Sequence, residues 1–134
     1  MDYHNNGKFT FLCRYHVVFC TKYKRRIFKN GLERFAKSTF QGITQGNKFS
    51  VIAAEVFPNY VHLLIDCDPA YGIDCCIRDI KRESTKALIQ QDPSLEKRLS
   101  RIWTREALIF TVGQDDQKAI NEFVSTRKSD TKRG

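Results

Sequence analysis

The stretch FSVIAAEVFPNYVHLLIDC, residues 49–67, decides the fold. Its two halves, 49–57 and 60–67, are rich in apolar, β-branched and aromatic residues, and Pro58-Asn59 lies between them. Such a pattern predicts two strands joined as a hairpin, with a two-residue turn as the shortest possible connection. The sequence therefore predicts an antiparallel pair of strands in the middle of the chain.

Two further strands and three helices are predicted around this hairpin. Residues 10–20, TFLCRYHVVFC, predict a strand before it, and 105–112, REALIFTV, predict a strand after it. Apolar residues recur at helical spacing over 31–45 and 72–91, which predicts two amphipathic helices. A last helix is expected from Asp115-Asp116, because acidic residues stabilise the positive end of a helix.

The order strand, helix, strand, strand, helix, strand is the split βαβ pattern of ferredoxin-like folds. We therefore expect an α+β fold, with a ferredoxin-like or RRM-like antiparallel sheet (βαββαβ), both main helices on one face and an extra C-terminal helix. Residues 93–104 are charged and are expected to be irregular. No repeat or linker divides the chain, so residues 1–134 are expected to form a single domain.

The charge balance favours a polyanionic partner. The chain has 23 Lys and Arg residues against 15 Asp and Glu residues, a formal net charge of +8. Nucleic acid is the usual partner of such a protein. A basic protein with no such partner is the alternative.

Cysteine usage favours a reducing compartment. The five cysteines are odd in number and form no CxxC pair, so they suggest neither a zinc site nor a disulfide framework. A cytoplasmic protein is the simplest interpretation. The N-terminus has no signal-peptide pattern, and no apolar stretch approaches the roughly 20 residues of a membrane span, so no membrane association is expected.

The segment NYVHLLIDCDPAYGI, residues 59–73, resembles a hallmark of the TnpA-like single-tyrosine transposases of the HUH superfamily, the insertion-sequence 200/605 class. Three further segments are similar to the family in the same order: YHVVFCTKYKRRIF at 15–28, IRDIKRESTKAL at 77–88 and IWTREALIFTVG at 102–113. The resemblance covers nearly the whole chain.

The resemblance implies a metal-dependent reaction on DNA. In the family, a His-x-His pair on a strand and a polar residue on the last helix hold a divalent metal such as magnesium or manganese. Alternate strand residues point the same way, so both imidazoles reach one ion. The metal orients the phosphate, and a tyrosine one helical turn before the polar ligand attacks it. The family acts as a dimer in which the last helix crosses to the partner's site, so a homodimer is expected.

This sequence departs from the family at the reacting positions. Tyr60 replaces the first histidine, Phe123 replaces the nucleophilic tyrosine, and Arg127 replaces the third ligand, which leaves His62. Phe has no oxygen to attack with, and Arg has no lone pair and repels a cation. We therefore expect no intact catalytic site and no cofactor.

The role of each of these positions has an alternative interpretation. His62 is either a weak metal candidate or a hydrogen-bonded structural residue, and Phe123 is either vestigial or part of a helix's apolar face. Tyr60 as a relocated nucleophile is disfavoured, because the sequence supplies no base for it. Arg127 either holds a phosphate in place of the metal or is a solvated cation near a helix end.

Two sets of cations are candidates for nucleic-acid contact. One combines basic residues with an aromatic that can stack on an unpaired base: Lys22, Tyr23, Lys24, Arg25, Arg26 and Lys29. The other recurs at i, i+4, i+8 along the second main helix: Arg78, Arg82 and Lys86. For either set, an ordinary solvated surface is the alternative.

These observations leave three candidate functions for the chain. The first is a binding module that recognises single-stranded or hairpin DNA and is inactive in strand cleavage and transposition. The second is an active DNA transposase with a divergent site. The third is an inhibitory dimer partner of an active transposase.

Overall fold

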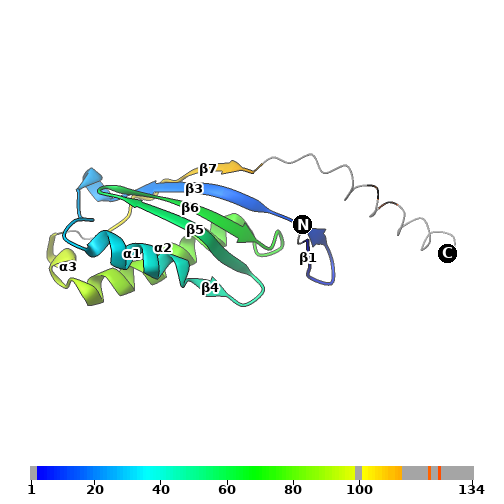
Figure 1. Cartoon of the computed structure of the whole chain (residues 1–134), viewed down its shortest axis with the longest axis horizontal. Coiled ribbons are helices and arrows are strands. Elements are labelled where there is room, and N and C mark those ends of the chain that lie inside the picture. The colour runs from blue at the N-terminus through cyan, green and yellow to red at the C-terminus, as the bar shows by residue number, and fades with distance from the viewer. Residues whose placement is uncertain (1–2, 99–100, 113–120, 122–123, 125–134) are drawn as a thin grey trace.

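A five-stranded antiparallel sheet, with two long helices packed on one face, dominates the computed structural model (Figure 1). The structure describes residues 3–98, 101–112, 121 and 124. The strand order is β4-β5-β6-β3-β7. The strands are β3 (Arg14–Cys20), β4 (Thr44–Gln45), β5 (Phe49–Phe57), β6 (Tyr60–Cys67) and β7 (Leu108–Thr111). The predicted α+β, ferredoxin-like sheet with helices on one face is confirmed.

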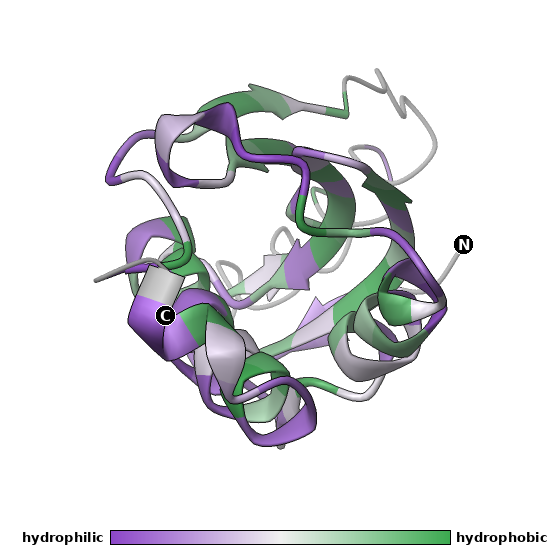
Figure 2. Cartoon of the chain, turned by 90° about the vertical axis from the view of Figure 1, so that its left-hand side faces the viewer, coloured by the Kyte–Doolittle hydropathy of each residue, from purple (hydrophilic) through white to green (hydrophobic). Residues whose placement is uncertain are grey.

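The helices α1 (Leu32–Gln41) and α2 (Ile73–Gln91) form the second layer, below the sheet in Figure 1. Each follows a glycine with a positive φ, Gly31 at 91° and Gly72 at 92°. L side chains rarely adopt this backbone conformation, so glycine allows the chain to turn sharply into each helix. Figure 2 colours the strands mostly hydrophobic, whereas the helices carry both hydrophobic and hydrophilic stretches, as amphipathic elements should.

The core lies between the sheet and the helices. Alternate residues of the two central strands are at most 1% exposed: Val17 and Phe19 of β3, and Val61, Leu63 and Ile65 of β6. Phe40 of α1 and Ile80 and Leu88 of α2 oppose them from the helix layer. Because successive strand residues point to opposite sides, the intervening residues lie on the other side of the sheet, here called the open face.

Trp103 connects the two layers. Its ring packs edge-on against Phe19 at a centroid distance of 4.8 Å and stacks on Phe28 at 5.7 Å. The indole N–H donates to Ser84 Oγ of α2 at 3.0 Å, so the buried polar atoms on both sides are satisfied. The aromatic cluster therefore ties the segment that precedes β7 to the helix layer.

The central hairpin is confirmed, with β5 ending at Phe57 and β6 beginning at Tyr60. The first helix is shorter than predicted. It ends at Gln41, the Gly42 N–H makes the last helical hydrogen bonds to the Ser38 and Thr39 carbonyls, and Thr44–Gln45 then form β4 against β5.

Three segments differ from the sequence prediction. The predicted strand 10–20 is divided, because β2 (Thr10–Phe11) pairs with β1 (His4–Asn5) in a separate hairpin before β3 begins. A short helix, α3 (Ser94–Arg98), replaces the expected irregular segment, and the Asp92 carboxylate accepts the Ser94 N–H at its start. The strand predicted at 105–112 is limited to β7, since only these residues pair with β3.

The predicted last helix falls outside the described residues, apart from Asn121 and Val124, which are helical. Within the described part of the chain, no helix combines the length and the apolar composition that crossing a bilayer requires.

Candidate nucleic-acid interface

Tyr60 and His62 both lie on the open face, as alternate residues of β6. Their neighbours across the sheet are known from the register. Tyr60 pairs with Cys20 of β3 and Phe57 of β5, and His62 pairs with Val18 and Glu55. All of these positions are only partly buried or exposed, so the candidate site is accessible from the side that α1 and α2 leave uncovered.

A second histidine lies beside His62. His16 of β3 places its Nδ1 atom 2.9 Å from His62 Nε2, and Phe110 of β7 stacks on the His16 ring at 4.7 Å. Sequence reasoning missed His16. Its signal was available, because His16, Val18 and Cys20 alternate in a strand that the split βαβ topology places next to β6.

The family's divalent metal does not fit the described residues. The ring centroids of His16 and His62 are 5.1 Å apart, close to the sum of the nitrogen separation and the two ring radii. The two nitrogens thus point at one another, one donating and the other accepting, instead of converging on an ion. Across the described residues, no three His, Cys, Asp or Glu side chains gather in a way that could hold a metal.

Tyr60 is engaged elsewhere. Its ring stacks on Phe57 across the hairpin turn, with centroids 4.3 Å apart and planes 9° from parallel. The other two predicted vestigial positions, Phe123 and Arg127, lie outside the described residues.

The predicted basic segment forms a surface loop, residues 22–29, here called the basic loop. Ile27 and Phe28 are buried at 4% and 3% exposure and anchor the loop in the core. Its cations Lys24, Arg25, Arg26 and Lys29 are exposed. No ion pair joins these four side chains to a carboxylate in the part of the chain that the structure describes.

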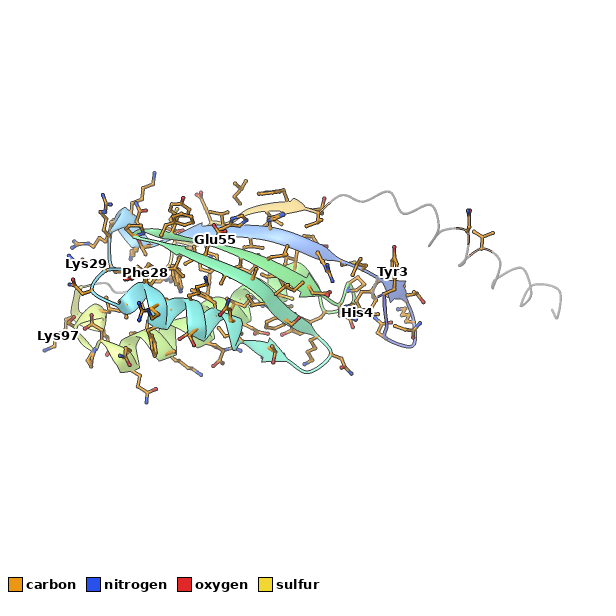
Figure 3. All side chains as sticks on the ribbon, viewed as in Figure 1. Tyr3, His4, Phe28, Lys29, Glu55 and Lys97 are labelled. Carbon is orange, nitrogen blue, oxygen red and sulfur yellow. The ribbon has the colours of Figure 1, made fainter. Side chains whose placement is uncertain are left out.

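Backbone hydrogen bonds attach both ends of the basic loop to the β5–β6 turn. The Thr21 N–H donates to the Asn59 carbonyl at 3.0 Å, and the Phe28 N–H donates to the Pro58 carbonyl at 3.2 Å. The Thr21 hydroxyl also donates to the Arg25 carbonyl at 2.6 Å. The basic loop is therefore fixed beside Tyr60, at the end of the sheet where Figure 3 labels Phe28 and Lys29.

Tyr23 is the exposed aromatic residue of the basic loop, at 73% exposure. It lies in a short 3₁₀ turn, Lys22–Lys24, in which Tyr23 and Lys24 have φ angles of 61° and 53°. Positive φ is costly for residues other than glycine and is common at binding sites. The Lys22 ammonium group lies 5.3 Å from the Tyr23 ring centroid, so cation and aromatic ring are presented together.

The second set of predicted cations lies on α2, in the layer away from the open face (Figure 1). Each pairs with an acidic neighbour on the same helix. Arg78 lies 2.9 Å from Asp74, Arg82 3.0 Å from Asp79, and Lys86 3.9 Å from Glu83. The structure thus separates these cations from Tyr60 and His62.

Asp79 is the buried member of the α2 charges, at 7% exposure. It pairs with Arg82 and accepts a hydrogen bond from the Tyr71 hydroxyl. The hydrogen bond to the carboxylate raises the pKa of Tyr71 to about 12. This end of α2 is therefore organised around a shared carboxylate within the fold.

Comparison with known proteins identifies the family. Residues 9–127 match the family model described as "Transposase IS200 like", and the chain belongs to this family. The ISDra2 transposase TnpA of Deinococcus radiodurans is 24% identical over 121 residues, which cover 89% of this chain and 86% of that protein. The transposase for insertion sequence element IS200 of Salmonella typhimurium is 25% identical over 124 residues, covering 91% and 81%.

Solved structures share the fold. The crystal structure of a putative transposase from Deinococcus radiodurans aligns with a TM-score of 0.73 at 22% identity, covering 92% of this chain and 96% of that one. A REP-associated tyrosine transposase bound to a REP hairpin aligns with a TM-score of 0.51 at 11% identity, covering 89% and 67%.

Proposed function

We propose that this chain is a DNA-binding member of its transposase family that recognises single-stranded or hairpin DNA without cleaving it. One observation carries the loss of cleavage. Tyr60 stands where the family has its first metal ligand, and the ring nitrogen of His62 is hydrogen-bonded to His16. A metal at His62 Nε2 would have to break that hydrogen bond and would find no second imidazole beside it on β6.

The sequence supports the same proposal at the position of the nucleophile. Phe123 has no oxygen that could form a covalent bond to phosphorus. Arg127, four residues later, carries a guanidinium group that can donate two parallel hydrogen bonds to a phosphate. In this proposal Arg127 supplies the charge and orientation that the family obtains from its metal.

DNA as the partner rests on the basic loop. Four exposed cations without carboxylate partners in the described part of the chain form a surface that attracts phosphates. The REP-associated relative is bound to a hairpin, and its fold extends over most of this chain. We further propose that the chain acts as one transposase-like domain, as a homodimer, and in the cytoplasm.

A cleavage assay tests the proposal. A labelled hairpin oligonucleotide is incubated with the purified protein and either magnesium or manganese, then resolved on a denaturing gel. The ISDra2 transposase with its own DNA ends serves as the positive control. We expect neither a shortened strand nor a denaturation-resistant protein–DNA species, while the hairpin binds in a native gel. A covalent adduct would show that a divergent site is active.

The native gel, together with a mixture of this protein and an active relative, separates the inhibitory dimer partner from the DNA-binding module. An inhibitory partner that binds no DNA itself would give no native-gel shift, yet would lower cleavage by an active relative when the two proteins are mixed.

A further inference from the structure

A row of side-chain rings, in two contacting groups, lies along the open face of the sheet. Its members come from four neighbouring strands: Phe57 of β5, Tyr60 and His62 of β6, His16 of β3, and Phe110 of β7. We call this row the ring band. Each contact in it joins residues that are neighbours on the same side of the pleated sheet, so the strand register determines which rings meet.

The contacts within the ring band are close. Phe57 and Tyr60 are stacked at 4.3 Å, and His16 and Phe110 at 4.7 Å with planes 18° apart. His16 and His62 are 5.1 Å apart and hydrogen-bonded. Tyr60 and His62 are alternate residues of β6, so the pair Phe57–Tyr60 and the group of His62, His16 and Phe110 lie on the same side of the sheet.

The ring band lies on the face of the sheet away from the two long helices, and a row of rings is unusual there. Such a face normally carries polar side chains toward water, whereas the packed face carries the apolar ones. Here Phe110 is 47% exposed, and the other four members are partly buried. Both long helices lie on the opposite side (Figure 1). A concentration of partly accessible rings of this kind indicates a binding surface.

The charge beside the ring band indicates which ligand it takes. The basic loop is attached to the turn between Phe57 and Tyr60, so exposed cations border one end of the band. Aromatic platforms beside a positively charged groove are the means by which proteins hold single-stranded nucleic acid, because every base has a face that can stack. A purely apolar partner would gain nothing from these cations.

We propose that unpaired DNA adjoining the bound hairpin crosses the open face, with its bases stacked on the ring band and its phosphates against the basic loop. The proposal rests on the proposed function in taking DNA as the ligand. It gives Tyr60 a role at the position where the family has a metal ligand: its ring, stacked on Phe57, offers a platform beside that of His62, His16 and Phe110.

A stacking assay with the full-length protein tests this. The probes are a blunt hairpin and the same hairpin with a 5′ or 3′ single-stranded extension that contains the fluorescent base 2-aminopurine. We expect the protein to quench this base and to bind one of the two extended hairpins more tightly than the blunt one. Replacing the extension's bases by abasic sites should weaken binding about tenfold, within the range for base–aromatic stacking.

Protein variants locate the contact. Tyr60→Leu and Phe110→Leu remove a ring but keep an apolar side chain, and each should reduce the preference for the extended hairpin over the blunt one. Phe9→Leu is the matched control, because Phe9 is 43% exposed but lies between β1 and β2, outside the band. Circular dichroism checks that each variant folds.

The outcomes separate the two proposals. If abasic and ordinary extensions bind equally while the blunt hairpin still binds, the ring band is not a stacking surface, although the proposed function stands. If no DNA binds, both proposals fail. If an RNA extension binds more tightly than the DNA one, the assignment to DNA is overturned. The abasic probes leave the protein unchanged, so they decide the question even where a variant misfolds.

Discussion

The basic loop and α2 each present a row of positive side chains, but the two rows differ in their pairing with carboxylates in the described part of the chain. On α2, Arg78, Arg82 and Lys86 each have an acidic partner three or four residues away. In the basic loop, Lys24, Arg25, Arg26 and Lys29 have no carboxylate partner among the described residues. Cations already paired within the protein have less to gain from a phosphate, so unpaired ones are the better candidates for DNA contact.

The neighbourhoods of the two regions reinforce this difference. The basic loop is fixed by backbone hydrogen bonds to the turn before Tyr60, whereas α2 lies on the far side of the sheet from Tyr60 and His62. A count of Lys and Arg along the sequence would rank the two regions as similar. Their partners and their face of the sheet distinguish them.

The largest expected effect comes from removing cations of the basic loop. In the triple variant Lys24→Ala, Arg25→Ala, Arg26→Ala, affinity for hairpin DNA with a single-stranded extension should fall by at least about tenfold. Each phosphate contact contributes a slope of about −0.7 in log affinity against log salt for single strands, so the slope should flatten by about 2. Fluorescence anisotropy at several salt concentrations measures both quantities. An unchanged slope would move the binding surface elsewhere on the protein.

Removing the exposed aromatic of the basic loop should have a smaller effect of a different kind. Tyr23→Ala should weaken binding to single-stranded DNA by about fivefold, since stacking on a base contributes about 1 kcal/mol at the lower end of its range. The salt slope should stay the same, because no charge is lost. Tyr23→Phe keeps the ring and should bind like the parent protein. Equal losses in both variants would indicate a role for the hydroxyl group instead of stacking.

Sequence periodicity predicts the architecture well, because the sheet and helix patterns extend over many residues. The hairpin at 49–67 and both long helices follow from it. The shorter elements escape it: β4 is two residues long, and β1 and β2 depend on pairing with each other. Such segments are stabilised by tertiary contacts, including the His4–Asp66 contact at 2.8 Å, and carry little local signal.

The candidate site was partly predictable for the same reason. Tyr60 and His62 stand out through the family's motif, and the basic loop stands out through its composition. His16 stands out through neither. Only the register, in which Val18 faces His62 and His16 faces Leu64, brings its Nδ1 atom within 2.9 Å of His62. The acidic residues among the α2 cations are visible in the sequence. The ion pairs that they form, and the side of the sheet on which α2 packs, are not.

A prediction on the buried carboxylate of α2 tests whether this region serves the fold. Asp79→Asn keeps the shape of the side chain but removes the charge that Arg82 and the Tyr71 hydroxyl contact. We expect the free energy of unfolding to fall by about 1 kcal/mol, as for the loss of charge-assisted hydrogen bonds, with DNA affinity unchanged. Urea denaturation measures the first quantity and anisotropy the second.

The same variant has a spectroscopic signature. The pKa of Tyr71, about 12 in the parent protein, should fall when the carboxylate is lost, because that hydrogen bond is the main cause of the rise. A spectroscopic pH titration, with Tyr71→Phe used to identify the signal, follows the change. An unaltered titration curve would mean that Asp79 and Tyr71 are not paired in solution.

The smallest effect is expected from the exposed cations of α2. Arg78→Ala combined with Lys86→Ala removes two positive charges, whereas the basic-loop variant removes three. The two side chains are 68% and 70% exposed, and their pairs with Asp74 and Glu83 contribute only a few tenths of a kcal/mol to stability. If DNA affinity depends on local unpaired cations, it should change by less than about twofold, and the salt slope should remain that of the parent protein. If DNA affinity depends instead on the overall electric field of the protein, the loss of affinity per charge removed should match that of the basic-loop variant. Anisotropy measured side by side on the two variants, at the same salt concentrations, distinguishes these cases. Equal losses per charge would remove the distinction between the two regions, because pairing within the protein would then have no bearing on which cations meet the DNA.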